Sequence, residues 1–101
     1  MNNIIIAGAG TFGTAVAERL SWNAKNRVTL HTIEKDVEKD INEHHQNRKY
    51  FPTRFLSRYL TATSSFSVFK EADVIMLVIP SKAIVPFSEE IRKNTDKEPL
   101  I

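Results

Sequence analysis

The sequence contains no cysteine, so disulfide bonds, thiolate nucleophiles and cysteine-ligated zinc are all excluded. Long apolar runs are missing too, since none approaches the roughly 18–20 residues that a membrane-spanning helix needs. The apolar run near the N-terminus stops at Ala9, which is too short for the core of a signal peptide. We therefore expect a cytoplasmic protein without membrane attachment.

Glycine is scarce, and the few glycines lie together. The chain has 3 glycines, whereas average usage predicts about seven in a chain of this length. All of them fall in the hexapeptide Gly8-Ala9-Gly10-Thr11-Phe12-Gly13, which matches G-x-G-x-x-G. The hydrophobic share of 42% and the charged share of 26% are ordinary for one globular domain. The net charge of +2 argues neither for nor against a nucleic-acid partner.

Runs typical of buried strands alternate with stretches at helical spacing. We expect strands at residues 4–7, 28–31, 60–63 and 74–79, helices at 14–23, 36–47 and 84–94, and one helical turn at 66–69. Residues 48–60 are expected to be irregular. This alternation predicts an α/β domain with a Rossmann-type doubly wound parallel sheet. Residues 98–101 read as the opening of another strand, so we expect a single incomplete domain over residues 1–101, truncated near its fifth strand.

The glycine hexapeptide stands between an expected strand and an expected helix, which is the context that a dinucleotide-binding turn requires. Gly8 permits the tight turn, Gly10 lets the backbone approach a pyrophosphate, and Gly13 allows the helix to pack closely on the strand. The free amides at the helix N-terminus then point at the phosphate oxygens. A P-loop is disfavoured because Thr14 stands where that motif has lysine. A purely structural turn is the other alternative.

In dinucleotide-binding domains an acidic residue about 20 positions after the glycines accepts the ribose hydroxyls. Glu34 has this place, and Ile33 beside it offers an apolar surface to the adenine ring. The alternative role of Glu34 is a favourable charge at a helix N-terminus. A carboxylate beside the ribose repels the 2′-phosphate of NADP, and the nearest basic residue in the sequence is Lys35. The sequence therefore predicts NAD as the preferred cofactor.

Further motifs carry a resemblance to a known family. They are the hexapeptide extended to Ala15, the segment 41–52 with the pattern Asn47-x-x-Tyr50-x-Pro52, and the segments 60–63, 72–75 and 79–81. Over essentially all of its length the chain resembles NAD-dependent glycerol-3-phosphate dehydrogenases. The resemblance implies a homodimeric oxidoreductase that interconverts dihydroxyacetone phosphate and sn-glycerol 3-phosphate by hydride transfer.

The resemblance also implies roles for individual residues. Thr11 and Phe12 line the pyrophosphate loop, and Ile33 flanks the adenosine. Tyr50 lies near the cofactor cleft, and Pro80 borders the nicotinamide side.

The family's catalytic lysines lie beyond residue 101. This chain is therefore expected to contain no catalytic residue and to bind NAD without turnover. Two positions depart from the family pattern. His31 stands where tryptophan is usual, and Ala83 stands where several members have an aromatic residue.

Other patterns favour simpler explanations. His44 and His45 are expected to be surface or interface residues and not metal ligands, because adjacent helical side chains point about 100° apart and no third ligand is evident. Residues 48–59 interleave basic and aromatic residues, as nucleic-acid stacking surfaces do. We favour a loop that packs its aromatic side chains inward, without a nucleic-acid partner. A free-standing NAD(H)-binding or sensing module is the alternative function, distinguished by what the gene encodes after Ile101.

Overall fold

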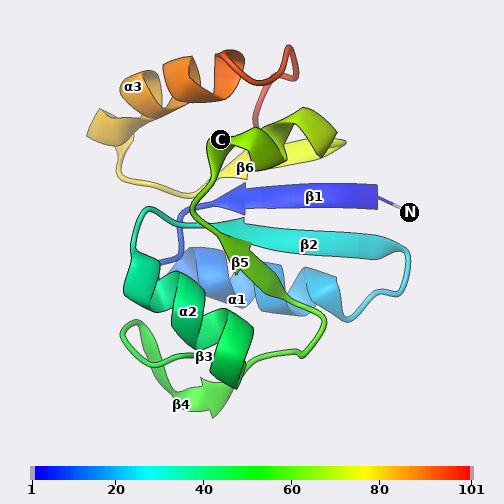
Figure 1. The fold of residues 1–101 in the computed structure, drawn as a ribbon, viewed down its shortest axis with the longest axis vertical. Coiled ribbons are helices and arrows are strands. Elements are labelled where there is room, and N and C mark those ends of the chain that lie inside the picture. Colours follow the sequence, from blue (N-terminus) through cyan, green and yellow to red (C-terminus); the bar gives the residue numbers. More distant parts are fainter. Residues whose placement is uncertain (1, 101) are drawn as a thin grey trace.

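The structure, a computed structural model, describes residues 2–100 and has a sheet of four parallel strands at its centre (Figure 1). The strands lie in the order β5-β2-β1-β6. Their bounds are Asn2–Ala7 for β1, Asn26–His31 for β2, Thr61–Thr63 for β5 and Val74–Leu77 for β6. Ile4 of β1 pairs with Val28 of β2 on one side and with Val74 of β6 on the other. Strands are thus confirmed at all four expected places.

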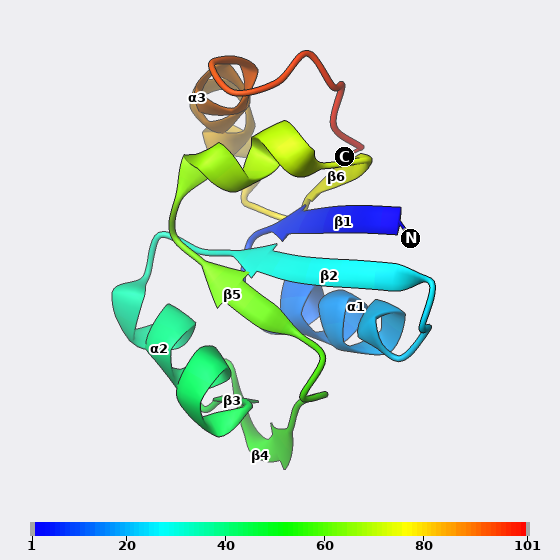
Figure 2. The same ribbon diagram turned by 45° about the vertical axis from the view of Figure 1, so that its right-hand side comes forward.

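Helices cover both faces of this sheet (Figures 1 and 2). Helices α1 (Thr11–Ser21) and α2 (Lys35–His44) lie on one face. The 3₁₀ helix η1 (Phe66–Glu71) and helix α3 (Ser81–Arg92) lie on the other. The arrangement confirms the predicted doubly wound α/β fold.

The side chains of β1 alternate between two hydrophobic cores. Ile4 and Ile6 join the core under α1 and α2, whereas Ile5 and Ala7 join the core under η1 and α3. All four are buried, as expected of a central strand in a parallel sheet. Because β1 is held at both edges and on both faces, the turn that follows Ala7 has a fixed position.

Some expected boundaries are wrong, each for a backbone reason. Helix α1 begins at Thr11 and not at residue 14, because the end of the glycine hexapeptide forms its first turn. Helix α2 stops before residue 47 because His45 takes a left-handed conformation, with φ of 55°. Strand β6 ends at Leu77 because its partner β1 ends at Ala7, whose carbonyl accepts the last bond between them, from Val78 at 2.8 Å.

The expectation that residues 48–60 are irregular is wrong in part. Strands β3 (Gln46–Asn47) and β4 (Phe51–Phe55) pair antiparallel beside α2, apart from the parallel sheet (Figure 2). The proline in β4 argues against a strand, but it is tolerated in a two-stranded edge. The expectation of inward-packed aromatic residues is wrong for Phe55 and Tyr59, which are 73% and 58% exposed.

Leu100, the last described residue, forms a parallel bridge with Met76 at the edge of β6. Its backbone amide and carbonyl each make a hydrogen bond of 2.7 Å to that strand. The strand expected at residues 98–101 is therefore paired at Leu100, whereas Ile101 lies outside the described residues.

His31, at the end of β2, lies among aromatic rings. The ring centroids of Phe66, Phe69 and Phe87 are 4.6, 5.2 and 5.5 Å from its own. The side chain is fully buried, and within residues 2–100 neither ring nitrogen has a hydrogen-bond partner. Burial lowers the pKa of His31 below its ordinary value, so the ring is neutral at pH 7.

We predict that the wild type loses stability on mild acidification and that His31→Phe removes this loss. The folded-state pKa lies below the unfolded value of 6.5, so the unfolded chain takes up a proton first as the pH falls below that value. The wild type then loses at most about 1.4 kcal/mol of unfolding free energy per pH unit from this group. Urea unfolding of both proteins from about pH 7.5 to about pH 5 measures the difference. If the unfolding free energy of both proteins changed with pH in the same way, a lowered pKa of His31 would be contradicted.

Candidate functional site

A pocket of about 370 Å³ lies at the carboxyl ends of β1, β2 and β6. Open parallel sheets bind ligands at these ends, where neighbouring strands lead to helices on opposite faces. The neighbouring strands β1 and β6 lead to helices on opposite faces, since β1 leads into α1 and β6 leads into α3. Six of the predicted cofactor-binding residues line the pocket: Gly8, Gly10, Ile33, Glu34, Tyr50 and Pro80.

Gly8 and Gly13 hold three backbone segments in direct contact. Gly8 has φ of 118°, a conformation that other residues rarely adopt. A Cβ on Gly8 would overlap the carbonyl oxygen of Val78, and a Cβ on Gly13 would overlap the carbonyl oxygen of Gly8. Both glycines therefore serve the packing of α1 and β6 against the end of β1.

Gly10 has no such packing role. Its φ of −74° suits any residue, and a Cβ there would have nothing within 4 Å beyond its chain neighbours. Gly10 caps the N-terminus of α1 without a side chain, so the first amides of the helix have no acceptor within the helix. Open space beside free amides and the positive end of a helix dipole fits an anion such as a pyrophosphate.

Two residues from the turn between β3 and β4 bind the carboxylate of Glu34. The hydroxyl of Tyr50 donates to Oε2 at 2.8 Å, and the ammonium of Lys49 pairs with Oε1. The hydrogen bond from Lys49 is the larger cause, and that from Tyr50 the second, of a lowered pKa for Glu34. Glu34 is therefore ionised at neutral pH and can accept hydrogen bonds from hydroxyl groups. Glu34 also stands at the N-cap of α2, where its charge is favourable, although its side chain makes no capping hydrogen bond.

Asn47 is a site residue whose role the sequence does not reveal. Its fully buried side chain donates from Nδ2 to the carbonyl of Ala9 at 3.0 Å and to Oγ1 of Thr14 at 2.9 Å. These bonds attach the end of β3 to the glycine hexapeptide and to the first turn of α1. The only sequence signal for Asn47 is its place in the Asn-x-x-Tyr-x-Pro pattern, and that pattern does not name a partner.

The other predicted residues contribute differently. Thr11, Phe12 and Gly13 are not among the residues that line the pocket. Oγ1 of Thr11 donates to the carbonyl of Tyr50 at 3.0 Å, whereas the side chain of Phe12 is 70% exposed. All three residues lie in the first turn of α1, where backbone amides have no acceptor within the helix. Ile33 lines the pocket and is 73% exposed, so its apolar surface is open to a ligand.

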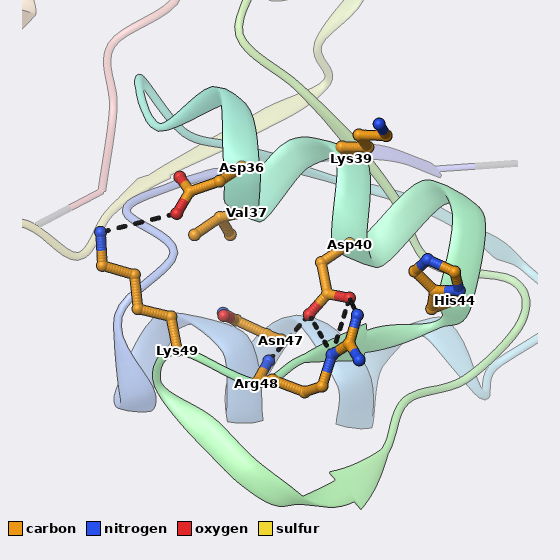
Figure 3. Close-up of a pocket in the computed structure, with 8 residues that line it drawn as sticks. All are labelled: Asp36, Val37, Lys39, Asp40, His44, Asn47, Arg48 and Lys49. Atoms are coloured by element: carbon orange, nitrogen blue, oxygen red, sulfur yellow. Dashed lines mark hydrogen bonds and ion pairs between the residues drawn. The ribbon is translucent and has the colours of Figure 1, made fainter.

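A second pocket of about 390 Å³ lies between α2 and the turn after β3 (Figure 3). Most of its lining is charged. The guanidinium of Arg48 donates to Asp40, with the shortest distance at 2.6 Å, and this lowers the pKa of Asp40. Lys49 also lines this pocket and lies 3.8 Å from Asp36.

Within residues 2–100, no group of three or more His, Cys, Asp or Glu side chains could hold a metal ion. In the same range, none of the helices has the length and apolar character needed to cross a membrane.

The strand order, the glycine turn at the start of α1 and the acidic residue after β2 define a Rossmann domain of the dinucleotide-binding class. Comparison with known proteins places the domain more narrowly. The chain belongs to the family described as NAD-dependent glycerol-3-phosphate dehydrogenase N-terminus, which matches residues 3–101.

Two curated relatives are named glycerol-3-phosphate dehydrogenase (NAD(P)+). The protein from Neorickettsia sennetsu is 35% identical over 94 residues, and the protein from Orientia tsutsugamushi is 37% identical over 92 residues. The alignments cover 93% and 91% of this chain. The chain spans about 28% of the length of each of these relatives.

Solved structures of glycerol-3-phosphate dehydrogenases have the same fold. The Coxiella burnetii enzyme superposes with a TM-score of 0.85 at 25% identity, over 97% of this chain and 30% of that one. The Saccharomyces cerevisiae enzyme gives a TM-score of 0.84 at 24% identity, over 94% and 31%.

We predict that serine destabilises the protein at one position of the hexapeptide and has little effect on stability at another. Gly13→Ser places a Cβ against the carbonyl of Gly8 and should cost about 1–3 kcal/mol or more of unfolding free energy. Gly10→Ser meets open space and supplies a favoured N-cap residue, so its effect should stay within about 0.5 kcal/mol. Urea unfolding measures both. Equal losses would show that Gly10 also has a packing role.

Proposed function

We propose that residues 1–101 form the NAD-binding portion of an oxidoreductase that interconverts dihydroxyacetone phosphate and sn-glycerol 3-phosphate. The observation that carries the proposal is the pocket at the strand ends, where the glycine turn, Glu34, Tyr50 and Pro80 come together from separate segments. Membership of the glycerol-3-phosphate dehydrogenase family supports the choice of substrates.

The residues present fit a dinucleotide. The open space at Gly10 and the first amides of α1 would take the pyrophosphate. The ionised carboxylate of Glu34 would accept the adenosine ribose hydroxyls, and the exposed side chain of Ile33 would lie against the adenine. Pro80, on the far side of the pocket at the start of α3, would border the nicotinamide.

When bound, the nicotinamide ring supplies or accepts the hydride. The contribution of this chain is to bind and orient the cofactor. Val78, Ile79 and Phe87 give the pocket wall beside Pro80 an apolar lining, which excludes water from that side. We propose that other residues transfer protons to and from the substrate. These residues would lie in the part of the relatives' sequences that this chain does not cover. We assign no catalytic residue to residues 1–101.

The proposal extends to a cytoplasmic homodimer, supported by family membership. We propose no nucleic-acid role for residues 48–59. The support is that Arg48 and Lys49 are neutralised by Asp40 and Glu34, and that Tyr50 is directed into the pocket region by its bond to Glu34. Multi-angle light scattering of the purified protein tests the dimer.

We predict that the 101-residue chain binds NADH but does not oxidise it when dihydroxyacetone phosphate is added. Titration followed by NADH fluorescence should show saturable binding, and the absorbance of NADH should stay at the no-protein rate. Gly10→Ser is the matched control, because it should keep the fold and lose at least tenfold in NADH affinity by crowding the pyrophosphate. Turnover that Gly10→Ser abolishes would show that catalytic groups lie within this chain.

A further inference from the structure

A pocket of about 610 Å³ lies at the amino ends of the strands, where the turn between α1 and β2 stands opposite the tips of the strand arrows (Figure 2). Its walls are the end of α1, this turn, the start of β2, and Tyr59 from the segment after β4. It shares no lining residue with the proposed cofactor pocket at the carboxyl ends. Its volume is in the range of about 300–1,000 Å³ that small-molecule sites have.

Two aromatic rings form a corner of this pocket. The ring centroids of Trp22 and Tyr59 are 6.0 Å apart, and the ring planes meet at 85°. Rings that meet edge to face do not cover each other, and these residues are 60% and 58% exposed. The indole Nε1 of Trp22 donates to Oε1 of Glu18 at 2.7 Å, which holds the ring in this orientation. The corner therefore offers aromatic surface to a planar ligand.

The charge beside this corner is positive. Arg27, at the start of β2, lines the pocket, and within residues 2–100 its guanidinium has no ion pair. The guanidinium of Arg58 lies over the ring of Tyr59, 5.4 Å from its centroid. None of the described residues that line the pocket is acidic. Because guanidinium groups bind phosphates and carboxylates through paired hydrogen bonds, the pocket suits an anion.

We propose that this pocket is a second ligand site, separate from the cofactor pocket, for a small aromatic anion: a planar ring that carries a phosphate or a carboxylate group. The ring lies in the corner between Trp22 and Tyr59, and the anionic group pairs with Arg27. The inference does not depend on the proposed NAD-binding function, because the two pockets are built from different residues.

The test uses Trp22 as the reporter, because it is the only tryptophan of the chain and its indole N–H gives a single side-chain resonance in a proton–nitrogen NMR spectrum. Phenyl phosphate and benzoate are the probes for the two anionic groups, and at least one of them should shift this resonance saturably. The tighter probe identifies the anionic group. Cyclohexyl phosphate and cyclohexane carboxylate have the same charges without an aromatic ring, and each should bind about fivefold more weakly than its aromatic counterpart.

Exposed positions supply the variants. Arg27→Gln should weaken binding of the tighter probe about tenfold. Tyr59→Ala should weaken it about fivefold, whereas Tyr59→Phe keeps the ring and should stay within about twofold of the wild type. Lys25→Gln is the matched control, because it removes an exposed cation of the same turn that does not line the pocket. Titration at about 0.15 M salt screens charges that are not in contact with the probe.

The absence of a saturable shift with both probes would overturn the proposal, as would equal binding of the aromatic and cyclohexyl compounds. Equal losses in Arg27→Gln and Lys25→Gln would show a general effect of positive charge and overturn the role of Arg27. Gly10→Ser, at the other end of α1, should bind the probe as tightly as the wild type. A loss in this variant would place the probe at the cofactor pocket and overturn a separate site, whereas NADH titration tests the proposed function independently.

Discussion

The backbone of Gly13 lies directly against the carbonyl group of Gly8, and the geometry of the site depends on this contact. It sets how close the N-terminus of α1 comes to the end of β1. Val78 packs against the same glycines from the other side, so the start of the segment toward α3 is located by the same contact. The open space at Gly10 therefore lies between two points of tight backbone packing, at Gly8 and at Gly13.

The turn between β3 and β4 gives the site its charge. Asn47 attaches this turn to the hexapeptide, and Thr11 and Tyr50 add a second connection. With the turn held in this way, Lys49 and Tyr50 reach Glu34 from a position well after it in the chain. The pocket thus combines a rigid inner wall of backbone with an outer wall of paired charges, which respond to salt and to ligand charge.

The sequence predicted the inner wall well and the outer wall poorly. Apolar runs and glycine spacing are local signals, so the four strands and the places of Gly8, Gly10 and Glu34 at the pocket follow from them. The pairs Asn47–Ala9 and Lys49–Glu34 join segments that are distant in sequence, and no periodicity encodes such partners. Strand β3 has only two residues, and β4 is exposed along nearly its whole length, so neither shows an alternation of buried and exposed side chains.

The position of β1 in the sheet has a consequence for the order of folding. Ile4 has one strand partner nearby in sequence, Val28, and one far along the chain, Val74. Closing the longer loop costs more conformational entropy, and contacts between near neighbours in sequence generally form earlier. The first βαβ unit can assemble while β6 is still unattached, but the pocket is complete only after β6 docks. The ability to bind therefore requires β6 to be docked, and a bound ligand stabilises this docked state.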